Sequence, residues 1–339
     1  MKIEEDIKLD FDDVLIRPQR STLKSRQEIE LTREDDKPFK FKWSTQTWNG
    51  IPIVAANMDT VGTFEMAKAL SNRGMLTCIH KYYSTKDWLK TDIDFNHTIP
   101  SIGVKREDLT KFKKIYKDKP TKFLCIDVAN GYGEYLPQHI KKIRKLFPDI
   151  ILIAGNVVTA DMTQELILAG ADIVKIGIGP GMGCSTTDVT GIGYPQLSAV
   201  IDCADAAHGL GGHIISDGGC KKFGDIIKAF AGGADFVMLG GMLAGHDEGL
   251  KENDIIIDKS GKKFIKFYGM SSRFANEKYN GGMKDYRASE GKEIMMPVKG
   301  PVDETLLEMM GAMRSACTYL GAKRLKEIPR RATFIKRFR

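Results

Sequence analysis

The sequence lacks the features typical of disulfide-stapled, membrane-spanning and zinc-binding proteins. Its six cysteines include no Cys-x-x-Cys pair, and its six histidines show no ligand spacing, so no zinc site is expected. No apolar run is long enough to span a bilayer. The first residues, Met1-Lys-Ile-Glu-Glu-Asp6, lack the basic and apolar segments of a signal peptide. We therefore expect reduced thiols and a cytoplasmic protein without a membrane partner.

Charge is unevenly distributed along the chain. The formal net charge is +7, and much of this positive charge lies between positions 323 and 339. Such a tail can bind nucleic acid, but we expect a solvated helix end and tail and no nucleic-acid partner. A third interpretation is that a mildly positive field attracts phosphorylated small molecules.

Short apolar runs alternate with amphipathic helical patterns along most of the 339 residues. Eight runs read as buried strands: 52–56, 76–80, 101–104, 123–127, 150–155, 173–177, 213–217 and 236–240. Helical patterns between them include 66–73, 135–147, 162–169, 195–210 and 223–231. Eight such units predict an α/β fold, a TIM (β/α)8 barrel, as a single domain over 1–339. An open sheet is the alternative if the count is wrong by one or two.

Two regions interrupt this alternation. Residues 1–50 form an N-terminal extension with a basic run from Arg17 to Arg26. A long insertion runs from 243 to about 302, between the eighth strand and a last helix at 304–320. Within it, segments 254–257 and 264–267 flank Ser260-Gly261 and predict a hairpin. Long insertions of this kind are usually lids or binding loops.

Polar residues and glycines gather where the apolar runs stop. In a (β/α)8 barrel the active site lies at this carboxyl end of the strands. Any one of these residues alone could instead cap a helix. The strand ends read His80-Lys81, Asp127-Val-Ala-Asn130, Gly155-Asn156, Gly177-Ile-Gly179, Asp217-Gly-Gly219 and Gly240-Gly241.

The sixth strand leads into a glycine-rich loop with one thiol at its tip, Cys184. Glycines at alternate positions allow the backbone to approach a ligand or ion closely. A buried small residue in a tight loop is the alternative, because free cysteine is often buried. The hydroxyls of Ser185, Thr186 and Thr187 follow, and an apolar pocket would not favour them. We therefore interpret Cys184 as a nucleophile.

The loops after strands seven and eight read as a phosphate site. Backbone N–H groups of such loops face the anion in this fold, and the glycines Gly218, Gly219, Gly240 and Gly241 suit that role. Tight-turn glycine is the alternative for each. Asp217 can accept hydrogen bonds from two ribose hydroxyls, so the site suits a nucleoside monophosphate with its base near Cys184.

A thiolate beside a purine can add to the electron-poor C2 atom and form a covalent intermediate. If C2 carries an amine, ammonia leaves with the help of a general acid, and a hydride must then be supplied. Thr186 and Glu290 are the candidates for proton transfer. The alternative for Glu290 is an exposed charge beside a helix.

These residues closely resemble the GMP reductase family, within the superfamily of inosine-monophosphate dehydrogenases and GMP reductases. The resemblance covers nearly the whole chain and implies a (β/α)8 barrel that assembles as a homotetramer. It implies an NADPH-dependent oxidoreductase of purine salvage that converts GMP into IMP and ammonia. The matching segments are Asp10-Phe-Asp-Asp-Val-Leu-Ile-Arg-Pro18, Ala56-Asn-Met-Asp-Thr-Val-Gly62, Asp127-Val-Ala-Asn-Gly131, Ala154-Gly-Asn-Val-Val158, Gly191-Ile-Gly-Tyr-Pro-Gln-Leu-Ser-Ala-Val200, Ser216-Asp-Gly-Gly219 and Tyr268-Gly-Met-Ser271.

The resemblance also implies roles for individual residues. Cys184 is implied as the nucleophile, with Thr186 and Glu290 as the proton-transfer pair. The implied GMP contacts are Asp217, Gly218, Gly219, Gly240, Gly241, Gly269, Met270, Ser271, Arg287, Ala288, Ser289, Glu290 and Gly291. The implied NADPH contacts are Lys81, Asp127, Val128, Ala129, Tyr286 and Arg287, with Ser25, Arg26, Ser315, Ala316, Cys317 and Thr318 across a subunit boundary. A potassium ion is implied at the carbonyls of Gly179, Gly181 and Cys184.

The loop around Cys184 departs from the family pattern. Family members have Ser-Val before the cysteine and Thr-Thr-Arg after it, whereas this chain has Met182-Gly183 and Ser185-Thr186-Thr187. Met182 has no hydroxyl for the nucleotide phosphate, and Thr187 replaces an arginine associated with the cation site. Phosphate affinity and potassium dependence therefore stay open.

Two alternatives concern function. An IMP dehydrogenase shares the barrel and the thiol, but typically carries a regulatory domain after strand two, and the chain from His80 to Ser101 leaves no room for one. It also uses an Arg-Tyr dipeptide to activate water, and this sequence contains none. A catalytically silent nucleotide-binding barrel is the other alternative, and the presence of Cys184, Thr186 and Glu290 argues against it.

Overall fold

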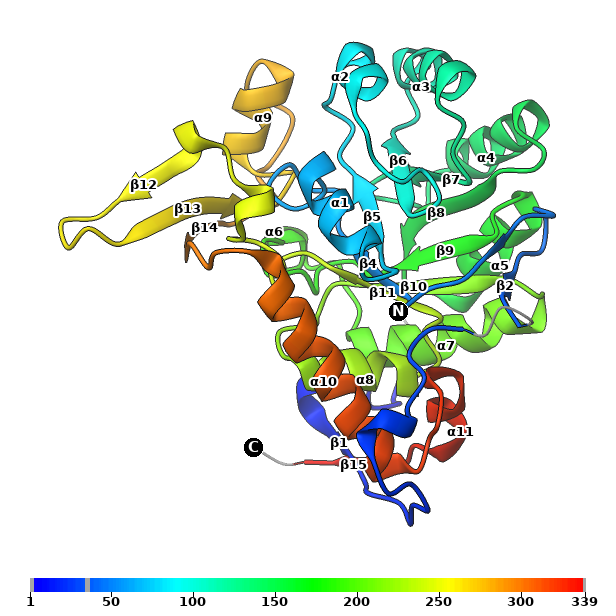
Figure 1. Cartoon of the computed structure of the whole chain (residues 1–339). Helices are drawn as coiled ribbons and strands as arrows, with labels where there is room; N and C mark the ends of the chain where they lie inside the picture. Colours follow the sequence, from blue (N-terminus) through cyan, green and yellow to red (C-terminus); the bar gives the residue numbers. More distant parts are fainter. Residues whose placement is uncertain (1–2, 34–36, 338–339) are drawn as a thin grey trace.

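The fold is built on a closed barrel of eight parallel strands (Figure 1). The computed structural model describes residues 3–33 and 37–337. The barrel order is β10-β11-β4-β5-β6-β7-β8-β9. The strands are β4 Ile53–Ala55, β5 Leu76–Ile79, β6 Thr98–Ile102, β7 Phe123–Asp127, β8 Ile151–Val157, β9 Ile173–Ile176, β10 His213–Asp217 and β11 Phe236–Leu239. The predicted (β/α)8 barrel is confirmed. Only the third strand is displaced: it begins before Pro100, which lies inside β6 rather than ahead of it.

Helices connect the strands and cover the outside of the barrel. They are α1 Phe64–Ser71, α2 Thr85–Lys90, α3 Arg106–Asp118, α4 Tyr135–Leu146, α5 Ala160–Ala169, α6 Thr186–Thr190, α7 Gln196–Gly209 and α8 Phe223–Ala231. Each long helix buries one apolar stripe; in α4 it consists of Leu136, Ile140 and Ile143. Between β5 and β6 the only helix is α2. The last long helix, α10 Val302–Leu320, packs against α8.

The N-terminal extension closes the amino end of the barrel. Its strands β2 Phe39–Lys40 and β3 Thr47–Trp48 form an antiparallel pair. Phe39 and Trp48 are both 2% exposed and pack against Phe236, the first residue of β11, with ring centroids 4.6 and 5.8 Å away. Aromatic side chains bury large apolar areas, so this pair seals the interior on the side away from the strand ends that carry the polar residues.

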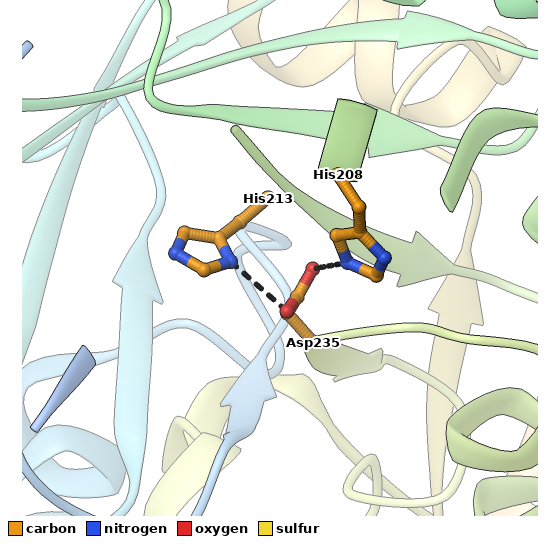
Figure 2. Close-up of side chains that lie close together, drawn as sticks. All are labelled: His208, His213 and Asp235. Atoms are coloured by element: carbon orange, nitrogen blue, oxygen red, sulfur yellow. Dashed lines mark hydrogen bonds and ion pairs between the residues drawn. The ribbon is translucent and has the colours of Figure 1, made fainter. Parts of the chain in front are cut away.

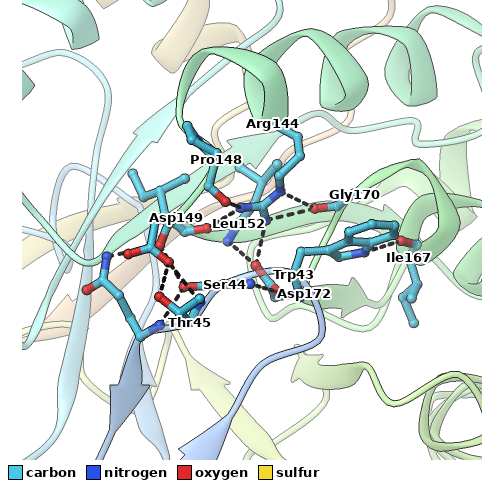
Figure 3. A network of polar contacts seen from close by, with 12 residues as sticks. Trp43, Ser44, Thr45, Arg144, Pro148, Asp149, Leu152, Ile167, Gly170 and Asp172 are labelled. Carbon is cyan, nitrogen blue, oxygen red and sulfur yellow. Dashed lines mark hydrogen bonds and ion pairs between the residues drawn. The ribbon is translucent and has the colours of Figure 1, made fainter.

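A buried aspartate fastens the extension to the barrel wall (Figure 3). Asp172 is 0% exposed and precedes β9. It forms an ion pair with Arg144 of α4 at 2.6 Å and accepts from the backbone N–H groups of Trp43 at 2.7 Å and Leu152 at 2.9 Å. A buried charge is tolerated when it is paired and fully hydrogen-bonded, as this one is. The contact joins the extension to α4 and β8.

The insertion after β11 is a separate small antiparallel sheet that extends beside the barrel (Figure 1). It contains β12 Ile255–Ile257, β13 Lys263–Tyr268 and β14 Glu293–Pro297, with α9 Arg273–Asn280 between the last two. The expected hairpin is present, and Gly261 takes a φ of +82° at its turn. The third strand, β14, escaped prediction because its residues, Glu293 to Pro297, do not alternate between apolar and polar.

The basic tail is only partly the solvated segment that we expected. β15 Phe334–Lys336 pairs antiparallel with β1 Val14–Ile16. Backbone hydrogen bonds therefore tie the end of the chain to the extension, a long-range pairing that charge composition does not reveal. The remaining short elements are η1 Phe11–Asp13, η2 Arg26–Glu28, η3 Asp247–Gly249, η4 Glu252–Asp254, η5 Leu325–Glu327 and α11 Ile328–Arg331. No helix in the part of the chain described here is long and apolar enough to cross a membrane.

Two histidines share one carboxylate where α7 turns into β10 (Figure 2). Asp235 lies 2.9 Å from Nε2 of His208 and 2.9 Å from Nδ1 of His213, whose Nε2 lies 2.8 Å from the Lys40 carbonyl. The hydrogen bond to Asp235 raises the pKa of His208. Burial opposes protonation of His213, but the Asp235 charge outweighs it and raises the pKa. Conversely, the two imidazoles outweigh burial and hold the pKa of Asp235 below its usual range.

The sign of these shifts fixes how the cluster contributes to stability. A histidine with a raised pKa stabilises the fold fully below its ordinary value of 6.5, and the contribution disappears as pH rises through the folded-state pKa. The lowered pKa of Asp235 makes its contribution available above 3.8. The cluster is therefore most stabilising in mildly acidic solution.

We expect Asp235→Asn to lower the free energy of unfolding by about 2 kcal/mol or more near pH 6, because it removes the partner of buried charged groups. The deficit should shrink as pH rises through the folded-state pKa values of the two histidines, because their charge is then lost from both proteins. Urea unfolding at several pH values measures this. Asp303→Asn is the control, since its partner Arg73, at 2.6 Å, does not titrate in this range. A deficit for Asp235→Asn that stays constant across pH, as the deficit for Asp303→Asn should, would contradict the assignment.

Candidate active site

The Cys184 loop is held by backbone contacts with the insertion. Cys184 forms an antiparallel bridge with Gly291, and the Gly183 carbonyl accepts from the Lys292 N–H at 2.9 Å. The Ser185 N–H donates to the Glu290 carbonyl at 3.0 Å. A Cβ built on Gly269 would lie 2.2 Å from the Gly183 carbonyl oxygen, so only glycine permits this approach. The fold thus joins the barrel mouth and the insertion at the thiol.

Three predicted catalytic side chains form a continuous chain of contacts. The Cys184 thiol donates to Thr186 Oγ1 at 3.2 Å, and the Thr186 hydroxyl donates to Glu290 Oε2 at 2.8 Å. Cys184 and Thr186 come from the β9 loop and the start of α6, whereas Glu290 comes from the insertion, 104 residues further along from Thr186. A thiol, a hydroxyl and a carboxylate in series can move a proton between a reacting atom and the carboxylate.

The predicted phosphate loops lie beside the same thiol loop. Gly218 and Gly219 take φ values of +98° and +83°, and the Gly219 N–H donates to the Pro180 carbonyl at 3.1 Å. The β10 loop therefore packs on the β9 loop. Met182 covers the next loop: a Cβ built on Gly241 would meet its Sδ at 3.0 Å. The thioether thus lies against one of the predicted phosphate glycines.

A buried lysine joins two predicted contact residues. Nζ of Lys175 lies 2.6 Å from Asp127 Oδ1 and 3.1 Å from Asp217 Oδ2. Asp217 Oδ2 also accepts from Asn156 Nδ2 at 2.9 Å. Burial opposes the charge on Lys175, but Asp127 and Asp217 outweigh it and raise the pKa well above its ordinary value. Burial likewise opposes ionisation of Asp127, and Lys175 and Asn57 together hold that pKa low.

The loop that carries Lys81 is attached to the insertion. The Tyr82 ring stacks on Tyr279 of α9, with centroids 3.6 Å apart and an interplanar angle of 11°. Tyr279 and Tyr268 both donate their hydroxyls to buried Asp59, and Lys278 Nζ lies 3.1 Å from the same carboxylate. Burial would raise the pKa of Asp59, but these donors lower it. Asp59 is therefore an ionised anchor for the root of the insertion.

The predicted contacts on the insertion differ in their exposure. Ser271, Arg287 and Ala288 are exposed, and Tyr286 is 82% exposed. Gly269, Met270, Ser289, Glu290 and Gly291 are half-buried. The Ser289 hydroxyl accepts from the Arg273 N–H at 3.0 Å, so this stretch rests on the first residue of α9. The remaining predicted mouth residues, Lys81, Val128, Ala129 and Gly240, are exposed or half-buried at the strand ends.

A second group of predicted contacts lies elsewhere. Ser25 and Arg26 belong to the start of η2, and Ser315, Ala316, Cys317 and Thr318 belong to the last turns of α10, which η2 contacts. Figure 1 places this end of α10 away from the insertion, near β1 and β15. The side chain of Cys317 is 0% exposed, so only its backbone could face a ligand. Within one chain these residues gather together but do not join Cys184.

The predicted potassium ligands fit such an ion only in part. The Gly181 carbonyl already accepts from the Cys184 N–H at 3.0 Å. Thr187 Oγ1 lies so near Gly179 that a Cβ there would be 2.0 Å away. One of the three predicted carbonyls is thus engaged in a hydrogen bond within the loop, and the Thr187 hydroxyl packs closely against Gly179.

Several site residues escaped the sequence analysis. Lys175 lies inside the apolar strand β9. Because a charged side chain is rarely buried without a partner, its place in the sequence indicates a buried acidic partner. Asn156 was noted only as a strand end, although it contacts Asp217. Asp59 and Tyr279 are 220 residues apart in sequence, and no local pattern connects them.

Comparison with known proteins agrees with this geometry. The model of the IMP dehydrogenase / GMP reductase domain matches residues 8–94 and 96–339. A GMP reductase from Enterobacter sp. (strain 638) is 57% identical, with 99% of this chain and 96% of the relative covered. One from Buchnera aphidicola subsp. Schizaphis graminum is 58% identical with the same coverage.

A solved structure is also similar over nearly its whole length. It is a cysteine-to-alanine variant of GMP reductase from Trypanosoma brucei in complex with guanosine 5′-monophosphate. The TM-score is 0.86 at 25% identity, covering 98% of this chain and 96% of that one. From the matched domain and these relatives, together with the thiol loop at the mouth of a (β/α)8 barrel, the chain belongs to the IMP dehydrogenase / GMP reductase family.

Proposed function

We propose that this chain is an NADPH-dependent reductase that converts GMP into IMP and ammonia. The observation that carries the proposal is the series of contacts from Cys184 through Thr186 to Glu290, at the barrel end where the predicted nucleotide loops lie. Relatives named GMP reductase, 57 and 58% identical over almost the entire chain, support the choice of substrate.

The first half of the reaction is deamination. The Cys184 sulfur attacks C2 of the guanine, and the thiol proton passes to Thr186 and on to Glu290. Glu290 returns a proton through Thr186 to the exocyclic amine, which leaves as ammonia. The product of this half is a purine joined to sulfur at C2 as a thioimidate.

The second half replaces the sulfur by hydrogen. Bound NADPH would supply a hydride to C2. As the C2–S bond breaks, Cys184 leaves as a thiolate and IMP is the product. The backbone contacts of Cys184, Gly183 and Ser185 with the insertion keep the sulfur in place in both halves. Covering of the base by the insertion excludes water, so that the thioimidate meets hydride rather than hydroxide.

We assign GMP binding to the residues around this thiol. Asp217 accepts from the ribose, and the loops of Gly218, Gly219, Gly240 and Gly241 receive the phosphate with backbone N–H groups other than that of Gly219, which donates to the Pro180 carbonyl. Gly269, Met270, Ser271 and the stretch from Arg287 to Gly291 cover the base. The phosphate subsite contains the Met182 thioether and no hydroxyl at that position, so we expect backbone donors to dominate there.

The residues present fit NADPH. Lys81 and Arg287 offer exposed cations to a pyrophosphate, and Tyr286 offers an 82% exposed ring. Asp127, Val128 and Ala129 line the mouth near them. Ser25, Arg26 and Ser315 to Thr318 lie apart from this mouth within one chain, and we propose that they bind the adenosine end of a cofactor held mainly by a second subunit. A homotetramer would satisfy this arrangement.

We further propose that the chain acts as one catalytic domain without an inserted regulatory domain, in the cytoplasm, in purine salvage. The short β5–β6 connection supports the first point, since α2 has only 6 residues.

Absorbance at the NADPH band tests the proposal directly. The enzyme should consume NADPH only when GMP is present, and chromatography should find IMP and ammonia in equal amounts. Formation of XMP from IMP with a nicotinamide cofactor would favour the dehydrogenase alternative instead. Binding of GMP without any turnover would indicate a silent barrel.

NADPH should be preferred over NADH. The proposed adenosine contacts include the Arg26 guanidinium and hydroxyls but no acidic residue, and arginine accommodates a 2′-phosphate. Arg26→Ala should weaken NADPH use by about 1.5–3 kcal/mol, the value of a hydrogen bond to a charged group, and leave NADH use nearly unchanged. Values of kcat/KM for both cofactors measure this. Arg20→Ala, at another exposed arginine of the extension, is the control. Equal efficiency of the wild type with both cofactors would contradict the assignment.

Cys184→Ala should abolish turnover and leave GMP binding largely intact, because it removes the nucleophile but no proposed nucleotide side-chain contact. Loss of a covalent nucleophile typically costs several orders of magnitude in kcat. Cys203→Ala, at a fully buried thiol of α7, is the matched control and should remain active. NADPH oxidation by Cys184→Ala within about tenfold of the wild-type rate would refute covalent catalysis.

Glu290→Gln should impair ammonia release more than hydride transfer, since an amide cannot accept and return the proton. Full GMP turnover measures both steps. The partial reaction of IMP with NADP⁺ measures hydride transfer alone, because it forms the thioimidate and NADPH without ammonia. Glu293→Gln, which breaks only the 3.0 Å ion pair with Lys266 on the same insertion, is the control. An equal loss in the two assays would show that Glu290 is not specific to deamination.

A further inference from the structure

The barrel interior contains one ammonium group that contacts both halves of the proposed site. Lys175 belongs to β9 and its side chain is 2% exposed. Its partners are Asp127 at the end of β7, Asp217 at the end of β10, and Asn57 of the β4 loop, with Nζ–O distances of 2.6, 3.1 and 3.5 Å. In the assignment above, Asp217 faces the GMP ribose and Asp127 faces the cofactor.

We propose that Lys175 is a positioning residue that holds the ribose-binding and cofactor-binding carboxylates together, so that one buried charge sets the geometry of both subsites. This inference rests on the proposed function and names a residue that acts through others: Lys175 lies beneath the carboxylates and reaches neither ligand.

The exposed fractions of the three side chains show which of them can face a ligand. The carboxylates of Asp127 and Asp217 are 36% and 22% exposed, whereas the lysine is 2% exposed. Each carboxylate therefore opens toward the barrel mouth while its inner side meets the ammonium. Asp217 Oδ2 is occupied by Lys175 and by Asn156 Nδ2, which leaves Oδ1 to accept from a ribose hydroxyl.

The charges of the three side chains also link the two subsites. Two carboxylates share one ammonium in a largely buried place, where an unpaired charge is costly. Without Lys175, burial and mutual repulsion would favour protonation of a carboxylate. A displaced Asp217 would accept ribose hydrogen bonds poorly, and a displaced Asp127 would alter the cofactor side at the same time. Loss of Lys175 should therefore weaken the binding of both GMP and the cofactor. Loss of a contact to only one carboxylate would weaken the binding of only one of them.

The test compares Lys175→Met with Arg144→Met. Arg144 is a matched control: its side chain is 13% exposed and pairs at 2.6 Å with Asp172, a fully buried carboxylate that precedes β9 and so lies at the amino end of the barrel. Lys175→Met should raise KM for GMP and for NADPH by roughly tenfold or more each, whereas Arg144→Met should change neither beyond its effect on thermal stability. Isothermal titration with GMP gives the binding change independently of turnover.

The pH profile of kcat/KM is a second measurement, and it would not change if Lys175 had a purely structural role. Lys175 holds the pKa of Asp127 low, so its removal should shift the ionisation of Asp127 to higher pH in the profile of kcat/KM for NADPH. The double variant Lys175→Met/Asp127→Asn should recover part of the lost stability, since only the Asp217 carboxylate is then left without its cation, but it should not recover GMP affinity. It also carries the test if the single variant does not fold.

Asn156→Ala separates the two subsites. It removes the other donor to Asp217 Oδ2 and should raise KM for GMP alone. The proposal is overturned if Lys175→Met keeps both KM values and the wild-type pH profile, or if Arg144→Met has the same effects. A wild type that binds GMP but does not reduce it would refute the proposed function, while GMP titration would still decide the role of Lys175.

Discussion

The site depends on a backbone contact between two segments that are far apart in sequence. The loop after β9 and the insertion before α10 are joined by the bridge between Cys184 and Gly291. Because Gly183 and Gly269 have no Cβ, the two backbones approach closely enough for this bridge to form. Through it the Thr186 hydroxyl reaches Glu290 at 2.8 Å. Neither the barrel alone nor the insertion alone contains all three side chains of the contact series Cys184, Thr186 and Glu290.

Much of the fold could be predicted because local patterns determine it. Strands such as 123–127 and 213–217 are apolar runs buried on both faces, and each ends in a polar residue, Asp127 or Asp217. The glycines and hydroxyl side chains around Cys184 indicate the thiol loop in the sequence. Here local composition, strand burial and position in the barrel all lead to the same conclusion.

What could not be predicted depends on contacts across the chain. Neither the pairing of β15 with β1 nor the third strand of the insertion has a local sequence signal. Both depend on backbone hydrogen bonds between segments, which residues of nearly every type can form. Lys175 is the instructive residue: a charged side chain inside an apolar strand demands partners, but the sequence does not say which carboxylates will surround it. The positions of Ser25 and Thr318, away from the thiol, likewise follow only from the folded chain.

The anchor at Asp59 has a consequence for the order of molecular events. Asp59 receives Tyr268, Tyr279 and Lys278 from the insertion, and Tyr279 stacks on Tyr82, next to Lys81. A movement that lifts α9 from the barrel must separate that ring stack and release the loop that carries Lys81. In the proposed reaction, release of the oxidised cofactor and uncovering of the purine would then be a single opening step, so that neither product could leave before the other was free to leave.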